Sequence, residues 1–202
     1  MIGVINFGLG NLGSIVNAYN TINCQIKTLN HPSEIENVTH LILPGVGSFR
    51  VGMKNLKNNN WDKEIYKHVK KQKPLLGICL GMQLLFEYGE EDGINKGLEL
   101  LKGKVSKIKN LNHKIPIVGW KNFKVIKNHV LLKNVKITAD YYFVHSYECI
   151  VENKNNLIAH SESVAACVSD NKNIFATQFH PEKSPPNGIN ILKNFSNWDG
   201  KC

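Results

Sequence analysis

The stretch Lys73–Phe86, KPLLGICLGMQLLF, decides the fold of this chain. Its apolar run at 75–78 predicts a short buried strand, and the apolar residues after Cys79 continue on the spacing of a helix through Phe86. Gly77 and Gly81 flank the cysteine and let the backbone pack closely around a side chain at the end of the strand. A reactive residue between a strand and a helix, with a glycine on either side, is typical of a nucleophile elbow, here with cysteine in place of serine.

Cys79 is therefore the candidate nucleophile. A helix that begins directly after it would direct free N–H groups and the positive end of its dipole at the sulfur, which lowers the pKa of a thiol. The competing interpretation is a buried structural cysteine, because free cysteine is among the residues most often buried. The stretch alone leaves the two interpretations open.

The length of 202 residues fits one large domain that spans the whole chain, 1–202. No apolar run is long enough to cross a bilayer, and the first residues, MIGVIN, resemble a strand and not a signal peptide. The five cysteines are scattered without a C-x-x-C pair, which argues against a disulfide framework and against a zinc site. We therefore expect a cytoplasmic protein with no metal or other cofactor and no membrane contact.

The formal net charge of +9 raises the question of an anionic partner. The positive residues are nearly all lysines dispersed among asparagines, and Arg50 is the only arginine. No aromatic residues alternate with the basic ones, as they do in grooves that bind single-stranded nucleic acid. A solvated lysine-rich surface is the favoured interpretation, and nucleic-acid binding is the lesser alternative.

Strand-like and helix-like segments alternate along the first half of the chain. Apolar runs predict strands at 2–6, 24–29, 40–43 and 75–78, and helical spacing predicts helices at 14–22 and 61–71. This alternation predicts an α/β fold with an open, mostly parallel central sheet and helices on both faces. In the second half, β-like runs at 104–108, 123–126, 141–144, 157–161, 165–169 and 174–179 predict a small antiparallel extension before a last helix at 187–198.

Two glycine-rich loops follow predicted strands. Residues 8–13, GLGNLG, match the dinucleotide fingerprint, but no acidic residue ends the second strand to hold a ribose, so we interpret them as a tight turn beside the active site. Residues 44–49, PGVGSF, follow the third strand, and ligands of open α/β sheets bind at the carboxyl ends of strands. For this second loop we favour a ligand-binding role over an ordinary turn into the next helix.

The segment Thr177–Ser184, TQFHPEKS, supplies the groups that a nucleophilic thiol needs. A thiol needs a base, and the base needs an orienting carboxylate. His180 and Glu182 end the last predicted strand and can face one site, although Pro181 makes the local path a turn. Taken singly, a histidine beside a proline is usually structural and a surface glutamate is usually idle. Beside Cys79, at the carboxyl end of a parallel strand, the two would complete a Cys-His-Glu triad.

The segments at 74–83, PLLGICLGMQ, and 177–184 resemble the two signature segments of the class I glutamine amidotransferases. Further segments at 6–12, 42–49, 116–120 and 142–147 resemble in particular the glutaminase subunits of imidazole glycerol phosphate synthases. The similarity runs in the expected order over nearly the whole chain. It implies a flavodoxin-like α/β fold and the hydrolysis of glutamine to glutamate and ammonia through a cysteinyl thioester.

The resemblance also implies roles for individual residues. Cys79 would be the nucleophile, His180 the base and then the acid, and Glu182 the residue that orients His180. The backbone N–H groups of Leu80 and Val46 would form the oxyanion hole, and a peptide flip in the loop at 44–47 would couple activity to the state of a partner. The positions that match those holding glutamine are Gly45, Gly47, Gln83, Ser146 and Tyr147. Gln83 lies one helical turn after Cys79 and can reach the same pocket.

The partner implied by the resemblance is a separate (β/α)₈ cyclase subunit, which would form a heterodimer with this chain and receive ammonia through an interior channel. The physical reason for a channel is that free ammonia at neutral pH is protonated and then is no longer a nucleophile. Asn11, His145 and Lys121 are the residues expected at the interface. For His145 a purely structural role is about equally well supported.

Two departures from the family pattern bear on the ammonia acceptor. Asn6-Phe7-Gly8 stands where Asp-Tyr-Gly is common, and residues 116–121, PIVGWK, replace the usual Pro-His-Met-Gly-Trp-Asn. Both positions should border the partner. The departures leave the glutaminase assignment intact and open the question of the acceptor. Histidine biosynthesis is favoured, and the alternative is a paralogous subunit that supplies ammonia to a synthase of amidino-modified cell-surface sugars. Two less favoured classes are another cysteine hydrolase or peptidase on the same scaffold and a catalytically idle regulatory or nucleic-acid-binding domain.

Overall fold

The centre of the computed structural model is an eight-stranded sheet in the strand order β2-β1-β3-β4-β14-β13-β12-β9. The structure describes residues 1–109, 115–136 and 138–201. Strands β2, β1, β3, β4 and β14 run parallel, and β13, β12 and β9 continue the sheet antiparallel. The strands are β1 (Ile2–Ile5), β2 (Ile26–Leu29), β3 (His40–Leu43), β4 (Leu75–Ile78), β9 (Lys124–Val125), β12 (Leu157–Ser161), β13 (Val164–Ser169) and β14 (Ile174–Thr177).

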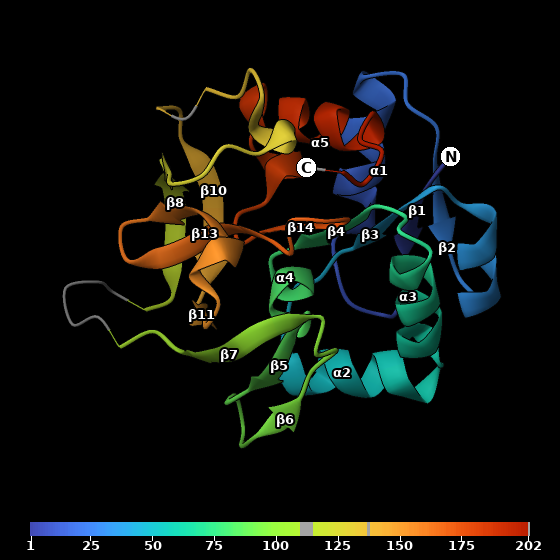
Figure 1. Ribbon diagram of the computed structural model, residues 1–202, viewed down its shortest axis with the longest axis horizontal. Coiled ribbons are helices and arrows are strands. Elements are labelled where there is room, and N and C mark those ends of the chain that lie inside the picture. The colour runs from blue at the N-terminus through green and yellow to red at the C-terminus, as the bar shows by residue number, and fades with distance from the viewer. Residues whose placement is uncertain (110–114, 137, 202) are drawn as a thin grey trace.

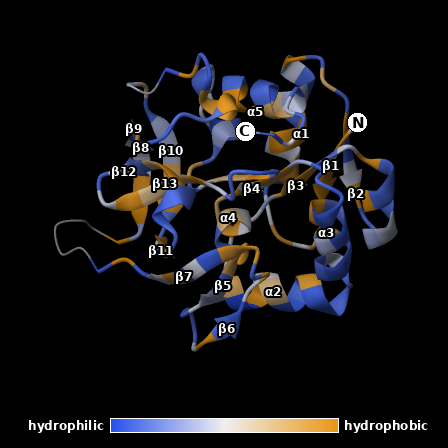
Figure 2. Ribbon diagram, in the orientation of Figure 1, coloured by the Kyte–Doolittle hydropathy of each residue, from blue (hydrophilic) through white to orange (hydrophobic). Residues whose placement is uncertain are grey.

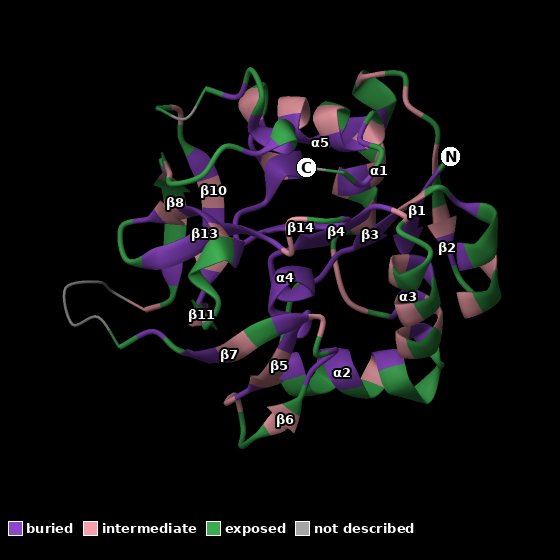
Figure 3. Ribbon diagram, viewed as in Figure 1, coloured by how far each residue is buried: buried purple, intermediate pink, exposed green. Residues whose placement is uncertain are grey.

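Helices cover both faces of this sheet (Figure 1). Helices α1 (Leu12–Thr21) and α5 (Asn187–Ser196) lie on one face, and α2 (Phe49–Asn58), α3 (Trp61–Lys70) and the short α4 (Leu80–Leu84) lie on the other. The strands between the two layers are apolar and buried (Figures 2 and 3), and β1, β4 and β14 are buried at every residue. A strand covered on both faces needs no polar side, which explains the continuous apolar runs in the sequence.

Two hydrophobic clusters attach the helices to the sheet. Tyr19 of α1 and Phe195 of α5 belong to the first cluster, and Phe49, Trp61 and Ile65 on the opposite face belong to the second. All five side chains are at most 1% exposed. Burying a large apolar side chain stabilises a fold by about 1.5–3 kcal/mol, so these helices are held mainly by the faces that they turn to the sheet.

Two smaller sheets stand beside the carboxyl edge of the parallel strands. One pairs β8 (Ile117–Lys121) with β10 (Tyr141–His145), and the other has the order β11-β7-β5-β6. Its strands are β5 (Phe86–Gly89), β6 (Asn95–Lys96), β7 (Leu101–Lys107) and β11 (Tyr147–Val151). Short 3₁₀ helices complete the described elements: η1 (Pro32–Asn37), η2 (Val130–Leu132), η3 (Lys154–Asn156) and η4 (Pro181–Lys183). The N–H of His180 donates to the carbonyl of Tyr142 at 2.9 Å, which joins β10 to the end of β14.

The predicted fold class is confirmed, with a mixed, mostly parallel sheet between helical layers. The helix predicted after Cys79 is wrong in length, because α4 ends at Leu84 and Phe86 begins strand β5. Leu84, Leu85 and Phe86 are all 0% exposed, and apolar periodicity cannot separate a buried helix from a buried strand. Helix α2 lies outside the predicted helices. Of the helices in the described part of the chain, none has the length and apolar character to cross a membrane.

Candidate active site

Cys79 lies at the sharp turn between β4 and α4 with a backbone φ of 54° and ψ of −108°. A positive φ is uncommon for a residue with a side chain and marks a strained turn. Gly81 makes the turn possible, because a Cβ there would lie 1.9 Å from the carbonyl oxygen of Leu43. A Cβ at Gly77 would lie 3.0 Å from the carbonyl oxygen of Gly81. The predicted elbow is therefore present, and both glycines are needed for close backbone packing.

Helix α4 has only five residues, Leu80–Leu84, so its dipole is much smaller than that of the longer helix predicted from the sequence. Its first N–H groups still lie beside the cysteine. Among the described residues, neither the Leu80 N–H nor the Val46 N–H has a hydrogen-bond acceptor.

His180 and Glu182 lie where β14 ends, next to the elbow. Strands β4 and β14 pair in parallel with Ile78 opposite Thr177, and the Cys79 N–H donates to the Thr177 carbonyl at 2.8 Å. His180 Nδ1 is 2.7 Å from Glu182 Oε1, and the two side chains are 2% and 1% exposed. The histidine and the carboxylate therefore lie at the same rim of the sheet as the cysteine.

The imidazole of His180 is set up as a charged group. Burial by itself lowers the pKa of His180, but hydrogen bonding to Cys79 and Glu182 and the charges of these groups outweigh it and raise the pKa to about 10. Because Nδ1 is used by Glu182, Nε2 is the ring nitrogen left for Cys79, and it has no hydrogen-bond partner in the described part of the chain. The raised pKa favours the imidazolium form of His180.

Ser184 fixes the histidine loop. Its hydroxyl donates to the His180 carbonyl at 2.6 Å and accepts from the Tyr142 N–H at 3.0 Å. The backbone of the loop that carries the base is therefore connected both to itself and to β10.

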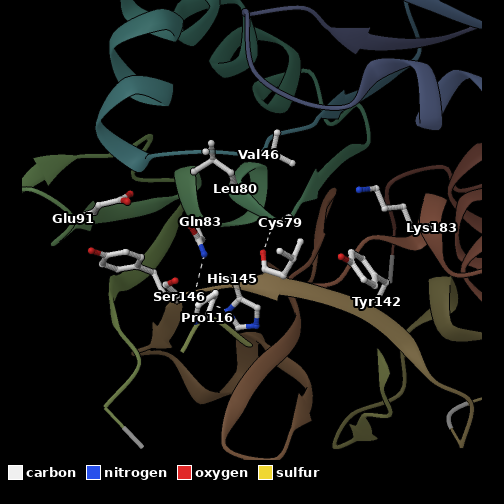
Figure 4. A pocket seen from close by; sticks show the side chains of 13 residues that line it. Val46, Cys79, Leu80, Gln83, Glu91, Pro116, Tyr142, His145, Ser146 and Lys183 are labelled. Carbon is white, nitrogen blue, oxygen red and sulfur yellow. Dashed lines mark hydrogen bonds between the residues drawn. The ribbon is translucent and has the colours of Figure 1, made fainter. Parts of the chain in front are cut away.

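A pocket of about 430 Å³ opens beside Cys79 (Figure 4). Of the residues predicted at the site, Val46, Gly47, Leu80, Gln83, His145, Ser146 and Tyr147 line it. Gly45 lies behind this wall, because a Cβ there would lie 2.8 Å from the Leu80 Cβ. The loop at 8–13 adjoins the same region, with the Cβ position of Gly10 3.3 Å from Pro44. The two glycine-rich loops therefore pack on each other next to the pocket.

The residues predicted at a partner interface are spread over different places. Asn11 caps α1 by accepting from the Ser14 N–H at 3.2 Å, and Lys121 forms an exposed ion pair with Glu162 at 2.8 Å. His145 is only 7% exposed, with Nδ1 2.8 Å from the Tyr147 carbonyl. Burial lowers the pKa of His145 to about 4, so it is a neutral group in the pocket wall with little surface to offer a partner.

The structure adds pocket residues to which the sequence analysis gives no individual role. Glu91, Pro116, Tyr142, Val144 and Lys183 also line the pocket. In the view of Figure 4, Gln83 lies between Glu91 and Cys79. Lys183, Tyr142, Val144 and Pro116 lie within segments that the sequence analysis quotes, which was the available signal, although it gave none of them a role in the pocket. Glu91 and Pro116 come from turns whose place depends on the packing of separate sheets.

Comparison with known proteins places these features in a family. The family model described as "Glutamine amidotransferase class-I" matches residues 3–197. The imidazole glycerol phosphate synthase subunit HisH of Caldanaerobacter subterraneus subsp. tengcongensis is 44% identical over 200 residues, which cover 96% of this chain and 97% of that protein. The HisH subunit of Bacillus licheniformis is 43% identical over 206 residues, covering 98% of this chain and 96% of that protein.

Solved structures share the fold at lower sequence identity. A crystal structure of a glutamine amidotransferase aligns with a TM-score of 0.76 at 17% identity and covers 98% of both chains. A structure of PurLQS from Thermotoga maritima aligns with a TM-score of 0.75 at 18% identity and covers 97% of both chains. At these identities the structures support the architecture alone.

Proposed function

This chain belongs to the class I glutamine amidotransferases, and from that premise we propose that it is the glutaminase subunit of an imidazole glycerol phosphate synthase. It would act as a single amidotransferase domain that hydrolyses glutamine and passes the ammonia to a cyclase subunit in histidine biosynthesis. The observation that carries the proposal is that Cys79, which lines the pocket, lies beside the end of β14, where His180 and Glu182 form a buried pair. Curated relatives named as HisH subunits, at 43–44% identity, support the choice of synthase.

The first half of the reaction forms the thioester. His180 Nε2 holds the proton that comes from Cys79, and the thiolate attacks the side-chain amide carbon of glutamine. The carbonyl oxygen becomes negative and binds the N–H groups of Leu80 and Val46, which have no acceptor among the described residues. His180 then returns the proton to the amide nitrogen. The C–N bond breaks, ammonia leaves, and a glutamyl thioester stays on Cys79.

The second half releases glutamate. Water takes the place of ammonia, gives a proton to His180 Nε2 and attacks the thioester carbon. The second tetrahedral intermediate uses the same two N–H groups, and its collapse breaks the C–S bond. Glu182 stays a carboxylate throughout and stabilises the imidazolium through Nδ1, to which it lies at 2.7 Å.

The pocket offers matching groups for the amino-acid end of glutamine. Glu91 is a pocket-lining carboxylate outside the triad and suits the α-ammonium group of the substrate. One of its oxygens, Oε2, already accepts the Phe49 N–H at 2.7 Å, which fixes the carboxylate at the start of α2. Gln83, Ser146 and Tyr147 line the same pocket and would hold the rest of the molecule. In the view of Figure 4, Gln83 lies between this carboxylate and Cys79.

An exposed apolar strip beside the pocket suits the (β/α)₈ partner. Val118 and Trp120 on β8 are 58% and 54% exposed, and the Trp120 ring packs edge-on against Tyr142, which lines the pocket. Large exposed apolar residues that gather next to a functional site mark a protein interface. Lys121 follows on the same strand. We place the cyclase subunit here, with the ammonia passing directly from the pocket into the partner.

The alternative acceptor is an amidino sugar precursor. Val118 and Lys121, where the chain departs from the family pattern, lie on this same strip beside the pocket. The departures therefore affect the proposed partner surface and leave the thiol chemistry untouched.

The four described cysteines are free thiols, which fits the proposed location in the reducing cytoplasm.

The decisive experiment is co-purification followed by a glutamine-dependent assay. The chain is expressed with the cyclase subunit of its own histidine pathway, and the complex is assayed for glutamine-dependent turnover of the histidine precursor. We expect a stable heterodimer whose glutaminase activity rises when the acceptor is bound. A chain that binds only the synthase of the sugar pathway, or that hydrolyses glutamine fully without any partner, would contradict the proposal.

The matched variants are Cys79→Ala and Cys24→Ala. Cys79→Ala should abolish glutamine hydrolysis while the heterodimer still forms, because the elbow backbone is unchanged. Cys24, half-buried beside Ser196, is remote from the pocket, and Cys24→Ala should keep the parent activity. Retained hydrolysis in Cys79→Ala would show that another group attacks the amide.

A further inference from the structure

Gln178 touches the sulfur of Cys79 from inside the protein. It follows β14 directly, is 0% exposed, and its backbone N–H donates to the Ala166 carbonyl at 2.9 Å. Its side-chain Nε2 lies 3.7 Å from Cys79 Sγ, and its Oε1 accepts a hydrogen bond from Gln83 Nε2 at 3.2 Å. Both ends of this buried amide are therefore engaged, one of them by the reacting atom of the proposed mechanism.

Which end of the Gln178 amide faces Cys79 is fixed by the backbone carbonyl of Tyr147, which acts through the side chain of Gln83. Gln83 Nε2 lies 3.1 Å from the Tyr147 carbonyl oxygen, which can only accept. The NH₂ end of Gln83 must therefore face Tyr147, and the same NH₂ group meets Gln178. Gln178 must accept this hydrogen bond through its side-chain oxygen, because two NH₂ groups would repel each other. Its own NH₂ end is then left to point at Cys79.

A donor at this place acts on the charge of the sulfur. Hydrogen bonds to an ionised acceptor are about twice as strong as those to a neutral one, so an N–H aimed at sulfur stabilises the thiolate more than the thiol. The thiol itself donates to the Val144 carbonyl at 3.8 Å, a contact that is lost when the proton moves to His180. The Gln178 donor stays in place for both forms of Cys79.

We propose that Gln178 is a catalytic hydrogen-bond donor that stabilises the Cys79 thiolate, and that Gln83 and the Tyr147 carbonyl fix its polarity. This inference deepens the proposed function and rests on Cys79 being the nucleophile. It gives the thiolate a fixed, water-free donor where α4 is too short to supply much of a helix dipole. It also assigns a second role to Gln83, which lines the pocket on one side and orients Gln178 on the other.

The test measures the ionisation of Cys79 directly. The rate of alkylation of Cys79 by iodoacetamide is followed against pH, with the modified peptide quantified by mass spectrometry. Gln178→Met fills a similar volume without a donor. Gln178→Glu keeps an oxygen for the Gln83 hydrogen bond and replaces the donor by a second oxygen, so one variant is available if the other does not fold. The inflection point of the plot of alkylation rate against pH marks the ionisation of Cys79. We expect this inflection to move up by about one pH unit in Gln178→Met and further in Gln178→Glu.

The plateau rate at high pH, where every molecule carries the thiolate, should stay within about twofold of the parent rate, because accessibility is unchanged. Thr177→Val is the matched control. It removes a buried side-chain hydrogen bond to the Phe179 carbonyl, at 2.9 Å, one residue from Gln178 and without contact to the sulfur. Its inflection should equal that of the parent. An unchanged inflection in both Gln178 variants, or an equal rise in Thr177→Val, would overturn the proposal.

The titration needs neither glutamine nor the cyclase subunit, so the two proposals can fail separately. An inactive heterodimer would end the proposed function whatever the inflection does. An active heterodimer whose Gln178 variants alkylate like the parent would end the role of Gln178 alone. In the active complex, Gln178→Met should lower kcat by about tenfold with little change in KM, because the donor acts on the nucleophile and not on bound substrate.

Discussion

His180 and Glu182 show how one buried pair sets the chemistry of a single residue. Glu182 holds Nδ1 at 2.7 Å, so the imidazole presents Nε2 to the cysteine and its pKa is raised to about 10, even though burial alone lowers it. The carboxylate therefore fixes the orientation of the base and, together with Cys79, raises its pKa. A neutral amide in its place would keep the shape of the side chain and lose both effects.

At this scale we predict that Glu182→Gln lowers kcat for glutamine hydrolysis by roughly 10³–10⁴-fold in the heterodimer, with KM little changed. The amide can donate to Nδ1, which leaves the proton on Nε2, where the cysteine proton should go. Steady-state kinetics with glutamine as the varied substrate measures the effect.

Glu64→Gln is the control for this prediction. Glu64 is a carboxylate on α3 that pairs with Lys67 at 2.7 Å, away from the pocket. Exposed pairs of this kind contribute at most about 1 kcal/mol to stability, so kcat should equal that of the parent. A drop of less than tenfold in Glu182→Gln would show that the base does not depend on this carboxylate.

At the scale of elements, the site is built by the close approach of α4 to the end of β3. A Cβ on Gly81 would lie 1.9 Å from the Leu43 carbonyl oxygen and 3.1 Å from that of Pro44. These atoms belong to the backbone and cannot move like the end of a flexible side chain. The elbow and the loop at 44–47 are thus kept in contact by the absence of one methyl group.

We predict that Gly81→Ala destabilises the fold by about 3 kcal/mol or more, because backbone must shift to admit the methyl group, and that it abolishes glutaminase activity by moving the loop at 44–47. Denaturant unfolding of the purified chain and the glutaminase assay measure the two effects. A glycine-to-alanine substitution at an uncrowded position shows whether the destabilisation comes from the close backbone contact or from replacing any glycine.

Gly13→Ala is that control. Gly13 lies in α1, and the nearest neighbour of its Cβ position is Asn11 Oδ1 at 3.9 Å. Alanine favours a helix over glycine by up to about 1 kcal/mol, so the variant should be as stable as the parent or more so. Equal destabilisation by the two substitutions would contradict the packing argument.

At the scale of the whole molecule, several histidines are buried in a neutral form. Burial lowers the pKa of His68, His129 and His145 to about 4, from a usual value of 6.5. The unfolded chain takes up protons on them below pH 6.5 while the folded chain does not, so stability falls as the pH drops from 6.5 to 4. The contribution of His180 to the pH dependence of stability has the opposite sign. Because its pKa is raised, this contribution is complete below pH 6.5 and is lost as the pH rises toward 10.

We predict a loss of stability of about 3 kcal/mol per buried histidine between pH 6.5 and 4, and a shallower dependence in His129→Asn. His129 Nδ1 accepts the Leu131 N–H at 3.2 Å at the start of η2, and asparagine can replace that cap without titrating. Urea unfolding at a series of pH values measures the slope. A slope identical to that of the parent would mean that His129 is not held neutral in the folded protein.

The sequence by itself determined the parts of this protein that depend on local requirements. Gly77 and Gly81 stand where the neighbouring backbone leaves no room for a side chain. The apolar runs at 40–43 and 157–161 form strands with buried faces. The triad residues were predicted from their places at the ends of strands together with the resemblance of 74–83 and 177–184 to the signature segments of the family.

The tertiary structure alone decided what depends on neighbours from distant segments. Leu84, Leu85 and Phe86 are apolar whether they continue a helix or begin β5, and pairing of β5 with β7 settles the choice. Glu91 becomes a pocket residue only because it meets the start of α2. The direction of the Gln178 amide is set by Gln83 and a carbonyl of β11. An apolar pattern records that a side chain is buried, whereas the groups it meets there are chosen by the packing of the whole chain.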